Sequence, residues 1–286
     1  MRMLALSPHL DDAVFSCGAT LARLADRGAH VALVTAFTRS VPDPRGFALA
    51  CQTDKGLQPG IDYMALRRAE DHAAANVLGV ADVVHLDLPE APHRGYNSAV
   101  ELFGTAREDD TIDQAIRVQL SELDQPELVL APRGLGGHVD HRRLIAAIPE
   151  RWTPVTVLYR DTPYALRVAP TATDAADRAA PIAAQLDRKL DACAAYATQL
   201  GFQFGGETAM RRALREFADA EGQRLKAGGP AEALAVSPSR SSCTQSEDQP
   251  LAGAILEQLL GSIAERSSIR AGRDEGSTRQ TDAHNR

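Results

Sequence analysis

One histidine and two aspartates near the start of the chain are grouped where metal-dependent chemistry could take place. His9, Asp11 and Asp12 directly follow the apolar run 3–6, which is typical of a strand that ends before a helix. Open α/β sheets hold their chemistry at such strand ends. Residues three apart around a turn can converge on one point whereas adjacent ones diverge, so the spacing favours His9 and Asp12 as a pair of metal ligands. Asp11 is then left as a candidate general base.

A second cluster contains His138, Asp140 and His141 and follows another apolar run, 128–130. We expect it to return to the same edge of the sheet as the first cluster. Zinc in hydrolytic sites is commonly held by two histidines and one carboxylate, with a fourth position open to water. His138 and His141 could both bind the ion, or one could bind it while the other acts in catalysis, and the spacing does not decide between these. The two clusters together predict a metal site.

The stretch Ser7-Pro8-His9-Leu10-Asp11-Asp12, followed later by His138-x-x-His141, resembles the two motifs of the PIG-L/LmbE-like family of zinc-dependent N-acetylglucosaminyl deacetylases. Both motifs match in order and spacing. Further similarity to the family lies in the segments 67–80, 158–164 and 196–199. The resemblance covers roughly residues 1–222. It implies a Rossmann-like three-layer sandwich whose active-site loops lie at the carboxyl ends of the strands.

The resemblance gives each residue of the two clusters a role. It implies His9, Asp12 and His141 as the ligands of one zinc ion per chain, or of another divalent transition metal. It also implies that Asp11 is the base and that His138 stabilises the oxyanion or protonates the leaving amine. Asp140 would orient an imidazole and favour its protonated form, as groups behind metal ligands commonly do.

Substrate contacts are expected from one helix and from the segments around the site. The candidates are Arg67, Arg68, Glu90, His93 and Tyr164. The resemblance implies that Arg67 contacts the substrate, although the sequence leaves open which of Arg67 and Arg68 faces the site. Glu90 and His93 lie in an irregular segment, 89–105, which also contains Arg94 and Tyr96. Tyr164 lies in one of the segments that are similar to the family.

Hydrophobic periodicity predicts alternating strands and helices, and hence an α/β fold with a mainly parallel sheet. The first strand is followed by a helix over 14–25 and a buried strand, His30–Phe37, which give a β-α-β start. The long segment Thr38–Ile61 is predicted to be a loop over the metal site. The other predicted elements are helices at 63–78, 112–123, 139–148, 181–200 and 207–221, and strands at 83–88, 128–131 and 155–159.

The character of the chain changes beyond about residue 222. We expect residues 1–222 to form the deacetylase domain and residues 223–286 to add a linker, a short amphipathic helix and a disordered tail. The linker is predicted over 227–250, which is dominated by small, polar, Pro and Gly residues that bury little apolar surface. Leu251–Ile263 carries one apolar helical stripe, and Ser267–Arg286 is polar.

Composition limits the partners that this chain can have. A net charge of -7 and a pI near 5.6 argue against nucleic acid, whose binding proteins carry clustered basic surfaces. Four widely spaced cysteines form no C-x-x-C pair, so we expect neither a disulfide framework nor a cysteine zinc site. In the absence of a signal-like or membrane-spanning apolar stretch, we expect a soluble, cytoplasmic protein without membrane insertion. A homo-oligomer is compatible with this sequence.

The expected reaction is hydrolysis of an acetamide on an amino sugar, in which Asp11 removes a proton from water and His138 stabilises the oxyanion. The expected partner is a small glycoconjugate that contains N-acetylglucosamine, for example in the biosynthesis of an antibiotic or another secondary metabolite. One alternative is an amidase that cleaves a larger N-acyl glucosamine or a thiol conjugate. A second alternative is a non-catalytic α/β binding protein, although the chain has neither the G-x-G-x-x-G nor the phosphate-loop pattern of nucleotide binders.

Overall fold

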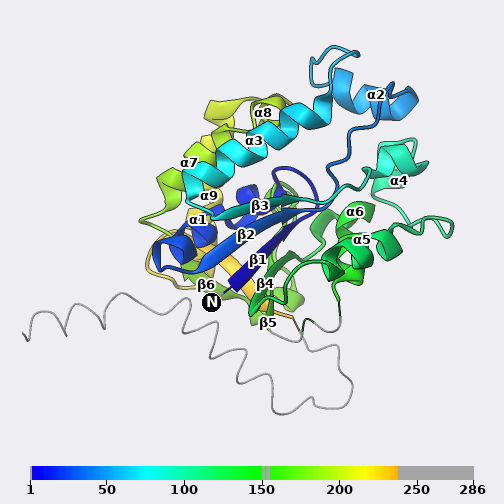
Figure 1. Cartoon of the computed structure of the whole chain (residues 1–286). Helices are drawn as coiled ribbons and strands as arrows, with labels where there is room; N and C mark the ends of the chain where they lie inside the picture. The colour runs from blue at the N-terminus through cyan, green and yellow to red at the C-terminus, as the bar shows by residue number, and fades with distance from the viewer. Residues whose placement is uncertain (1, 150–151, 153–154, 238–286) are drawn as a thin grey trace, which may run out of the picture.

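One sheet of seven strands organises the part of the chain that the computed structural model describes, which is residues 2–149, 152 and 155–237 (Figure 1). The strands are β1 (Arg2–Ser7), β2 (His30–Thr35), β3 (Asp82–His85), β4 (Leu128–Pro132), β5 (Val155–Tyr159), β6 (Arg178–Pro181) and β7 (Ala231–Val236). Their order across the sheet is β3-β2-β1-β4-β5-β7-β6. The strands β1 to β5 pair in parallel, and β7 runs antiparallel to β5 and β6. The predicted α/β fold with a mainly parallel sheet is confirmed.

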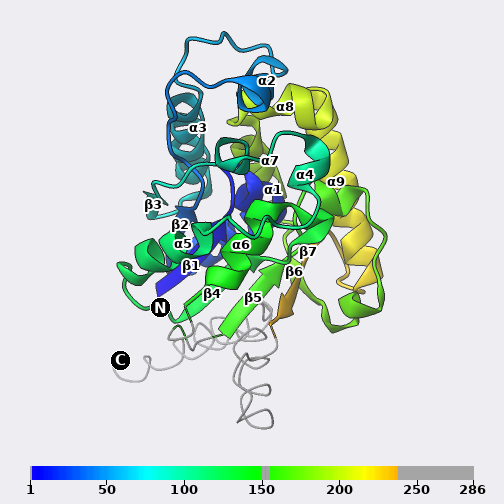
Figure 2. The same cartoon turned by 90° about the vertical axis from the view of Figure 1, so that its right-hand side faces the viewer.

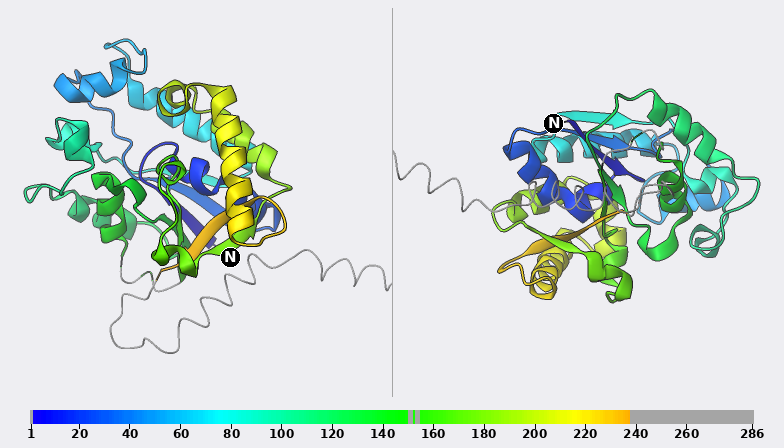
Figure 3. Two further views of the ribbon diagram at one scale, coloured as in Figure 1. Left: turned by 180° about the vertical axis from the view of Figure 1, so that it is seen from behind. Right: turned by 90° about the horizontal axis from the view of Figure 1, so that it is seen from below.

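Helices cover both faces of this sheet and give three layers (Figures 2 and 3). They are α1 (Asp12–Asp26), α2 (Gly46–Thr53), α3 (Tyr63–Leu78), α4 (Ala99–Leu102), α5 (Ile112–Ser121), α6 (Val139–Ala147), α7 (Leu186–Ala194), α8 (Ala197–Phe204) and α9 (Glu207–Arg224), with short 3₁₀ helices η1 (Ala91–Arg94), η2 (Leu135–Gly137), η3 (Tyr164–Leu166) and η4 (Ala172–Ala176). Helices α1, α3, α7 and α9 contribute to one apolar core, and α5 and α6 to a second. Strand β1 serves both cores, because its successive side chains point to opposite faces.

The two histidine-containing clusters meet because β1 and β4 are neighbours. Met3 pairs with Leu128 and Ala5 with Leu130, so both strands end at the same edge of the sheet. Strands β2 and β3 lie on one side of β1, whereas β4 and β5 lie on the other. The boundary between β1 and β4 is therefore the switch point at which open α/β sheets bind their ligands. Helices α1 and α6 begin just beyond these two strand ends, as the sequence predicts.

Several elements differ in extent from the prediction. Strands β2 and β3 end earlier than expected, at Thr35 and His85. The segment Thr38–Ile61, predicted to be a loop, contains helix α2. The helix predicted at 181–200 is two helices, α7 and α8, because the backbone of Tyr196 between them is not helical. No helix within the described ranges is long and apolar enough to cross a membrane.

The prediction of a linker over 227–250 is wrong for part of that segment. Strand β7 lies inside it and pairs with β5 on one side and β6 on the other. This strand consists largely of alanine and contains the charged Glu232, so it lacks the apolar run that is typical of a buried strand. Residues 238–286, which include the predicted helix at 251–263 and the predicted tail, lie outside the described residues.

Glu232 can be buried in β7 because partners surround its carboxylate. It accepts hydrogen bonds from the backbone N–H groups of Ala19 and Thr20 and from the Thr20 hydroxyl, and it pairs with Lys189 Nζ at 2.7 Å. The helical backbone of α1 is interrupted at Cys17, so the two N–H groups lie at the start of its second half. A carboxylate is favourable at a helix N-terminus. Glu232 therefore ties β7 and α7 to the helix that begins in the first cluster.

Replacing Glu232 with alanine should destabilise the protein strongly. The substitution leaves the buried ammonium of Lys189 without its carboxylate, and breaking a buried pair costs about 3–5 kcal/mol. We expect the free energy of unfolding, measured by urea denaturation, to fall by about that amount. Alanine at the exposed Glu122 is the control and should change it by less than about 0.5 kcal/mol. A Glu232→Ala protein as stable as the parent would show that this pair does not hold the helix to the sheet.

Candidate metal centre and active site

Asp12 lies between the imidazoles of His9 and His141. Its Oδ2 atom is 3.1 Å from His9 Nδ1 and 3.1 Å from His141 Nε2. His9 follows β1, Asp12 opens α1, and His141 lies in the first turn of α6, so the three come from the ends of adjacent parallel strands. One potential ligand atom of each lies within 4.8 Å of the other two. The structure thus brings together the three residues that the sequence predicts as metal ligands.

Asp161 holds His141 from the side opposite Asp12. Its Oδ1 accepts a hydrogen bond from His141 Nδ1 at 2.6 Å, and its Oδ2 accepts from the backbone N–H groups of residues 133–135 at 2.9–3.1 Å. A proton on Nδ1 leaves the lone pair of Nε2 free to bind a metal ion. Nε2 is buried and has no hydrogen-bond partner among the described residues. This is the arrangement found around metal-ligating histidines.

Asp140 supports the other imidazole of the ligand set. Its Oδ2 lies 3.0 Å from His9 Nε2 and accepts a hydrogen bond from the backbone N–H of Ala91, while its Oδ1 accepts from Arg94 Nη2 at 2.7 Å. Burial opposes ionisation of Asp140, but His9 and Arg94 hold its pKa well below the usual range. The carboxylate therefore orients the ring of His9 so that Nδ1 faces Asp12.

The ligand set attracts positive charge. Burial disfavours a charged imidazole, yet Asp12 and Asp140 more than offset it and raise the pKa of His9 well above its usual value. Against the same effect of burial, Asp12 and Asp161 raise the pKa of His141 to about 9. Burial also disfavours the ionised form of Asp12, but the two histidines hold its pKa well below the usual range. A divalent cation held by two imidazoles and a carboxylate satisfies the same attraction, so these residues fit a zinc ion.

Asp11 is buried next to the ligands and titrates near neutral pH. Burial and the neighbouring charge of Asp12 raise its pKa to about 7, while Arg67 partly opposes the shift. Gln203 Nε2 donates a hydrogen bond to Asp11 Oδ2 at 2.9 Å, and Arg67 Nη2 lies 3.7 Å from the same oxygen. A general base is most effective when its pKa lies near the working pH. The surroundings of Asp11 suit the role that the sequence predicts for it.

His138 faces the site as a neutral imidazole. Its Nδ1 accepts a hydrogen bond from the backbone N–H of Asp140 at 3.2 Å, so the ring proton is on Nε2. Burial and the charge of His9 lower the pKa of His138 to about 3, and Asp140 opposes this only in part. The ring centres of His138 and His9 are 4.9 Å apart. His138 therefore offers an N–H donor beside the ligands, which suits stabilisation of an oxyanion better than donation of a proton.

Of the two arginines on α3, Arg67 faces the site. It is buried, and its Nη1 lies 2.6 Å from Glu90 Oε1. Arg68 instead donates hydrogen bonds to the Thr38 carbonyl and the Ser40 hydroxyl, away from Asp11 and Glu90. Adjacent helical residues point roughly 100° apart, so both cannot face inward. Arg68 therefore does not face Asp11, and its contact with the substrate stays a prediction.

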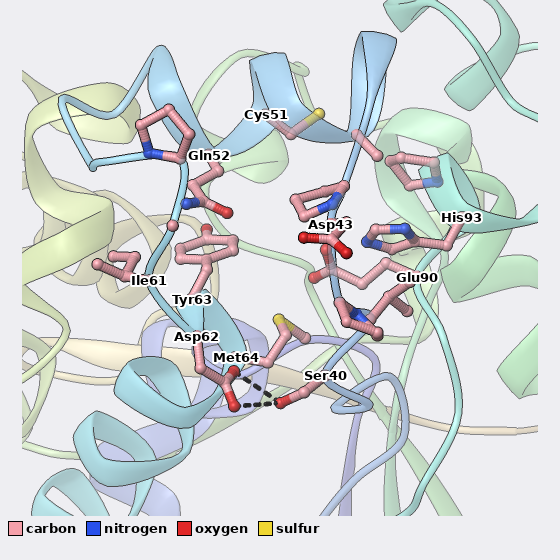
Figure 4. A pocket seen from close by; sticks show the side chains of 17 residues that line it. Ser40, Asp43, Cys51, Gln52, Ile61, Asp62, Tyr63, Met64, Glu90 and His93 are labelled. Carbon is pink, nitrogen blue, oxygen red and sulfur yellow. Dashed lines mark hydrogen bonds between the residues drawn. The ribbon is translucent and has the colours of Figure 1, made fainter.

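A pocket of about 310 Å³ opens beside Glu90 (Figure 4). It is lined by residues from the segment 40–64 and by three residues of 90–93, among them the predicted contacts Glu90 and His93. Tyr164 is not among its lining residues. The Tyr164 ring packs against that of His141 with centres 5.5 Å apart, next to Phe103. The predicted substrate contacts are therefore divided between this pocket and the surroundings of the ligand set.

Two residues of the site escape the sequence prediction. Asp161 directly follows β5, so its place at the carboxyl edge of the sheet is a signal that the sequence contains. Gln203 lies on α8, and nothing in the surrounding sequence points to Asp11. Only the packing of α8 over the sheet edge reveals its role.

Comparisons with known proteins identify relatives of this chain. A 2'-N-acetylparomamine deacetylase from Streptomyces fradiae is 33% identical over 171 residues, which is 57% of this chain and 58% of that protein. The match thus spans little more than half the length of this relative. A solved pseudoaglycone deacetylase of an antimicrobial reagent is 30% identical with a TM-score of 0.66, and the match covers 84% of this chain and 99% of the other. The zinc-inhibited form of teicoplanin deacetylase is 27% identical with a TM-score of 0.64. That match covers 83% of this chain and 99% of the other.

The family itself is identified by its sequence model. The model described as PIG-L, GlcNAc-PI de-N-acetylase, matches residues 4–151, which include both clusters and the arginine on α3 that faces the site. The two solved deacetylases share the fold over most of this chain. The chain belongs to the PIG-L family of de-N-acetylases.

Proposed function

We propose that this protein is a metal-dependent hydrolase that removes the N-acetyl group from an amino sugar in a small glycoconjugate. The observation that carries the proposal is the buried acid Asp11 beside a complete set of zinc-type ligands at the switch point of the sheet. Membership of a de-N-acetylase family supports it. Since the named relatives deacetylate paromamine and teicoplanin compounds, antibiotic biosynthesis is the setting that we propose.

Zinc is the cofactor that we propose, held by His9 Nδ1, Asp12 Oδ2 and His141 Nε2. When bound, the ion supplies a Lewis acid that polarises the acetamide carbonyl and lowers the pKa of a water molecule from ~15.7 to ~7. The buried His141 Nε2, which makes no hydrogen bond, supports this assignment. A solved relative is described in a zinc-inhibited form, which supports binding of zinc within this fold. Asp140 and Asp161 engage the opposite nitrogens of the two rings and so determine which nitrogen is left for the ion.

The groups of the chain divide the proton transfers between them. Asp11 takes a proton from the attacking water, whose oxygen adds to the acetyl carbon. The Nε2–H group of His138 donates a hydrogen bond to the carbonyl oxygen as that oxygen gains negative charge. The C–N bond then breaks, the nitrogen receives the proton held on Asp11, and acetate and the free amine leave. Arg67 favours the ionised form of Asp11 before the first transfer.

The alternatives raised by the sequence have less support. A non-catalytic binding protein gives no reason for a buried carboxylate next to three metal-type ligands, because such a charge costs desolvation free energy. Cleavage of a larger acyl group finds no support in the relatives described above, whose names state deacetylation.

Alanine substitutions at the two histidines near the start of α6 should separate metal binding from catalysis. His141→Ala removes a ligand, so we expect most of the zinc measured by plasma mass spectrometry to be lost. His138→Ala removes an oxyanion donor, so the kcat for acetate release from an N-acetylglucosamine derivative should fall about 10²–10³-fold while zinc is retained. His72→Ala, at an exposed histidine on α3, is the control and should change neither quantity. Full activity of His138→Ala would contradict its proposed role.

Asp161→Asn should weaken zinc binding without removing a ligand. Asparagine has one acceptor oxygen where aspartate has two, because an N–H₂ group replaces the other. Its side chain therefore cannot accept hydrogen bonds both from His141 Nδ1 and from the backbone N–H groups. Loss of such a supporting contact costs about 10–100-fold in metal affinity. We expect the Kd for zinc, measured by competition with a chelating dye, to rise by this factor. Asp219→Asn, at an exposed position on α9, should leave the Kd unchanged, and an equal Kd for both variants would refute the supporting role.

A further inference from the structure

Among the residues that the structure describes, Gln203 is the only one whose side chain donates a hydrogen bond to the carboxylate of Asp11. Its Nε2 lies 2.9 Å from Asp11 Oδ2, whereas Arg67 Nη2 lies 3.7 Å from the same oxygen. A hydrogen bond from an N–H group needs about 2.7–3.2 Å between the two heavy atoms. Gln203 is therefore the group that fixes the orientation of this carboxylate, while Arg67 adds positive charge at a longer distance.

The two carboxylate oxygens of Asp11 have different surroundings. Oδ2 is turned towards Gln203 and Arg67, which lie on α8 and α3. Oδ1 makes no hydrogen bond with any described residue. Although Asp11 as a whole is only 2% exposed, this oxygen keeps contact with solvent. Oδ1 is therefore the oxygen that a water molecule can approach.

The other half of the Gln203 amide has no hydrogen-bond partner. Its Oε1 is buried and accepts no hydrogen bond from any residue that the structure describes. A buried acceptor without a donor costs free energy, and native folds retain few of them. Turning the amide over would place Oε1 against an ionised carboxylate, where two acceptors would face each other. The side chain is thus arranged to serve Asp11 at the expense of its own oxygen, which indicates a functional role.

The helix that carries Gln203 is fastened to two other helices. At the start of α8, the backbone N–H and the hydroxyl of Thr198 donate to Glu70 of α3 at 2.8 and 2.7 Å. At its end, the ring of Phe204 packs against that of Phe15 on α1, with centres 5.2 Å apart. Because α1 begins directly after the base, one helix helps to place both the base and the amide. Groups carried by helices are placed more precisely than groups carried by loops.

We propose that Gln203 is a positioning residue, which holds Asp11 Oδ2 so that Oδ1 takes the proton from the attacking water. The inference rests on the proposed function, in which Asp11 is the base. One O–H bond of the water breaks, an O–H bond forms at Oδ1, and the water oxygen adds to the acetyl carbon. The same proton passes from Oδ1 to the nitrogen as the C–N bond breaks. Gln203 contacts neither water nor substrate, because one amide atom faces Asp11 and the other is buried.

Gln203→Met tests the proposal, because methionine keeps the length of the side chain and lacks the N–H donor. The assay uses the zinc-loaded full-length protein and an N-acetylglucosamine derivative that the parent protein deacetylates. We expect kcat to fall about 10–100-fold, since a small misplacement of a reacting group costs this much. KM and the zinc content should stay at the parent values, because neither amide atom contacts the substrate or the metal ligands. An unchanged kcat, or a loss of kcat/KM that comes from KM alone, would overturn the proposal.

Gln199→Met is the matched control, because Gln199 lies one turn earlier on α8 and serves the fold. It is buried, and its Nε2 donates to the hydroxyls of Tyr63 and Thr198 at 2.9 and 2.7 Å. We expect Gln199→Met to lower the urea concentration at the midpoint of unfolding and to leave kcat near the parent value. Gln203→Met should lower kcat with little change in the midpoint, because removal of the unpaired Oε1 offsets the lost hydrogen bond to Asp11. Equal losses of kcat in both variants would indicate a general effect of α8 packing and would overturn the role of Gln203.

A second variant and the parent protein separate failure of the inference from failure of the proposed function. Gln203→Asn keeps the amide but shortens the side chain by one methylene, so it should also lower kcat at unchanged KM, and it replaces the methionine variant if that one does not fold. If the parent protein is active and the variants match its kcat, the deacetylase function stands and only the role of Gln203 is overturned. If the parent protein releases no acetate from any N-acetylated amino sugar, the deacetylase function is overturned and the inference with it.

Discussion

The approach of Asp12 to His141 is the contact on which the rest of the site depends. Asp12 follows β1 and His141 follows β4, so the two can meet only where these strands are neighbours in the sheet. The strand order changes direction at this boundary, which is where open α/β sheets bind their ligands. The fold therefore supplies the convergence of the predicted metal ligands. Glu232 adds to this, because it fixes the helix that Asp12 opens against β7 and α7.

Such a concentration of buried charge is costly, and the surrounding residues offset most of the cost. Asp140 is shared by His9 and Arg94, and Asp161 receives one imidazole and three backbone N–H groups. These contacts engage His9 Nε2 and His141 Nδ1. They leave His9 Nδ1 and His141 Nε2 facing Asp12 Oδ2. His141 Nε2 makes no hydrogen bond and faces Asp12 Oδ2 at 3.1 Å. A buried polar atom without a hydrogen bond is rare in a native fold, and a position for an ion accounts for it.

The sequence predicts the residues of the candidate site better than it predicts where the folded domain ends. The predicted ligand pair, His9 and Asp12, follows from the local spacing of these residues after a strand, which folding does not alter. Which of His138 and His141 is the metal ligand and which is the catalytic group could be predicted only from the family resemblance. Two histidines three residues apart are equivalent in the local sequence. Strand β7 and Gln203 could not be found, since the burial of Glu232 depends on Lys189 and the role of Gln203 on the packing of α8, and neither is a local property.

Arg67 links the part of the site that the fold fixes to the part that the loops supply. It lies on the long helix α3, whose position is set by the core, yet its guanidinium is shared between Asp11 of the first cluster and Glu90 of the segment after β3. Because one cation serves two carboxylates, an acid at position 90 draws positive charge away from the base. The composition of the pocket and the ionisation of Asp11 are therefore coupled through a single side chain.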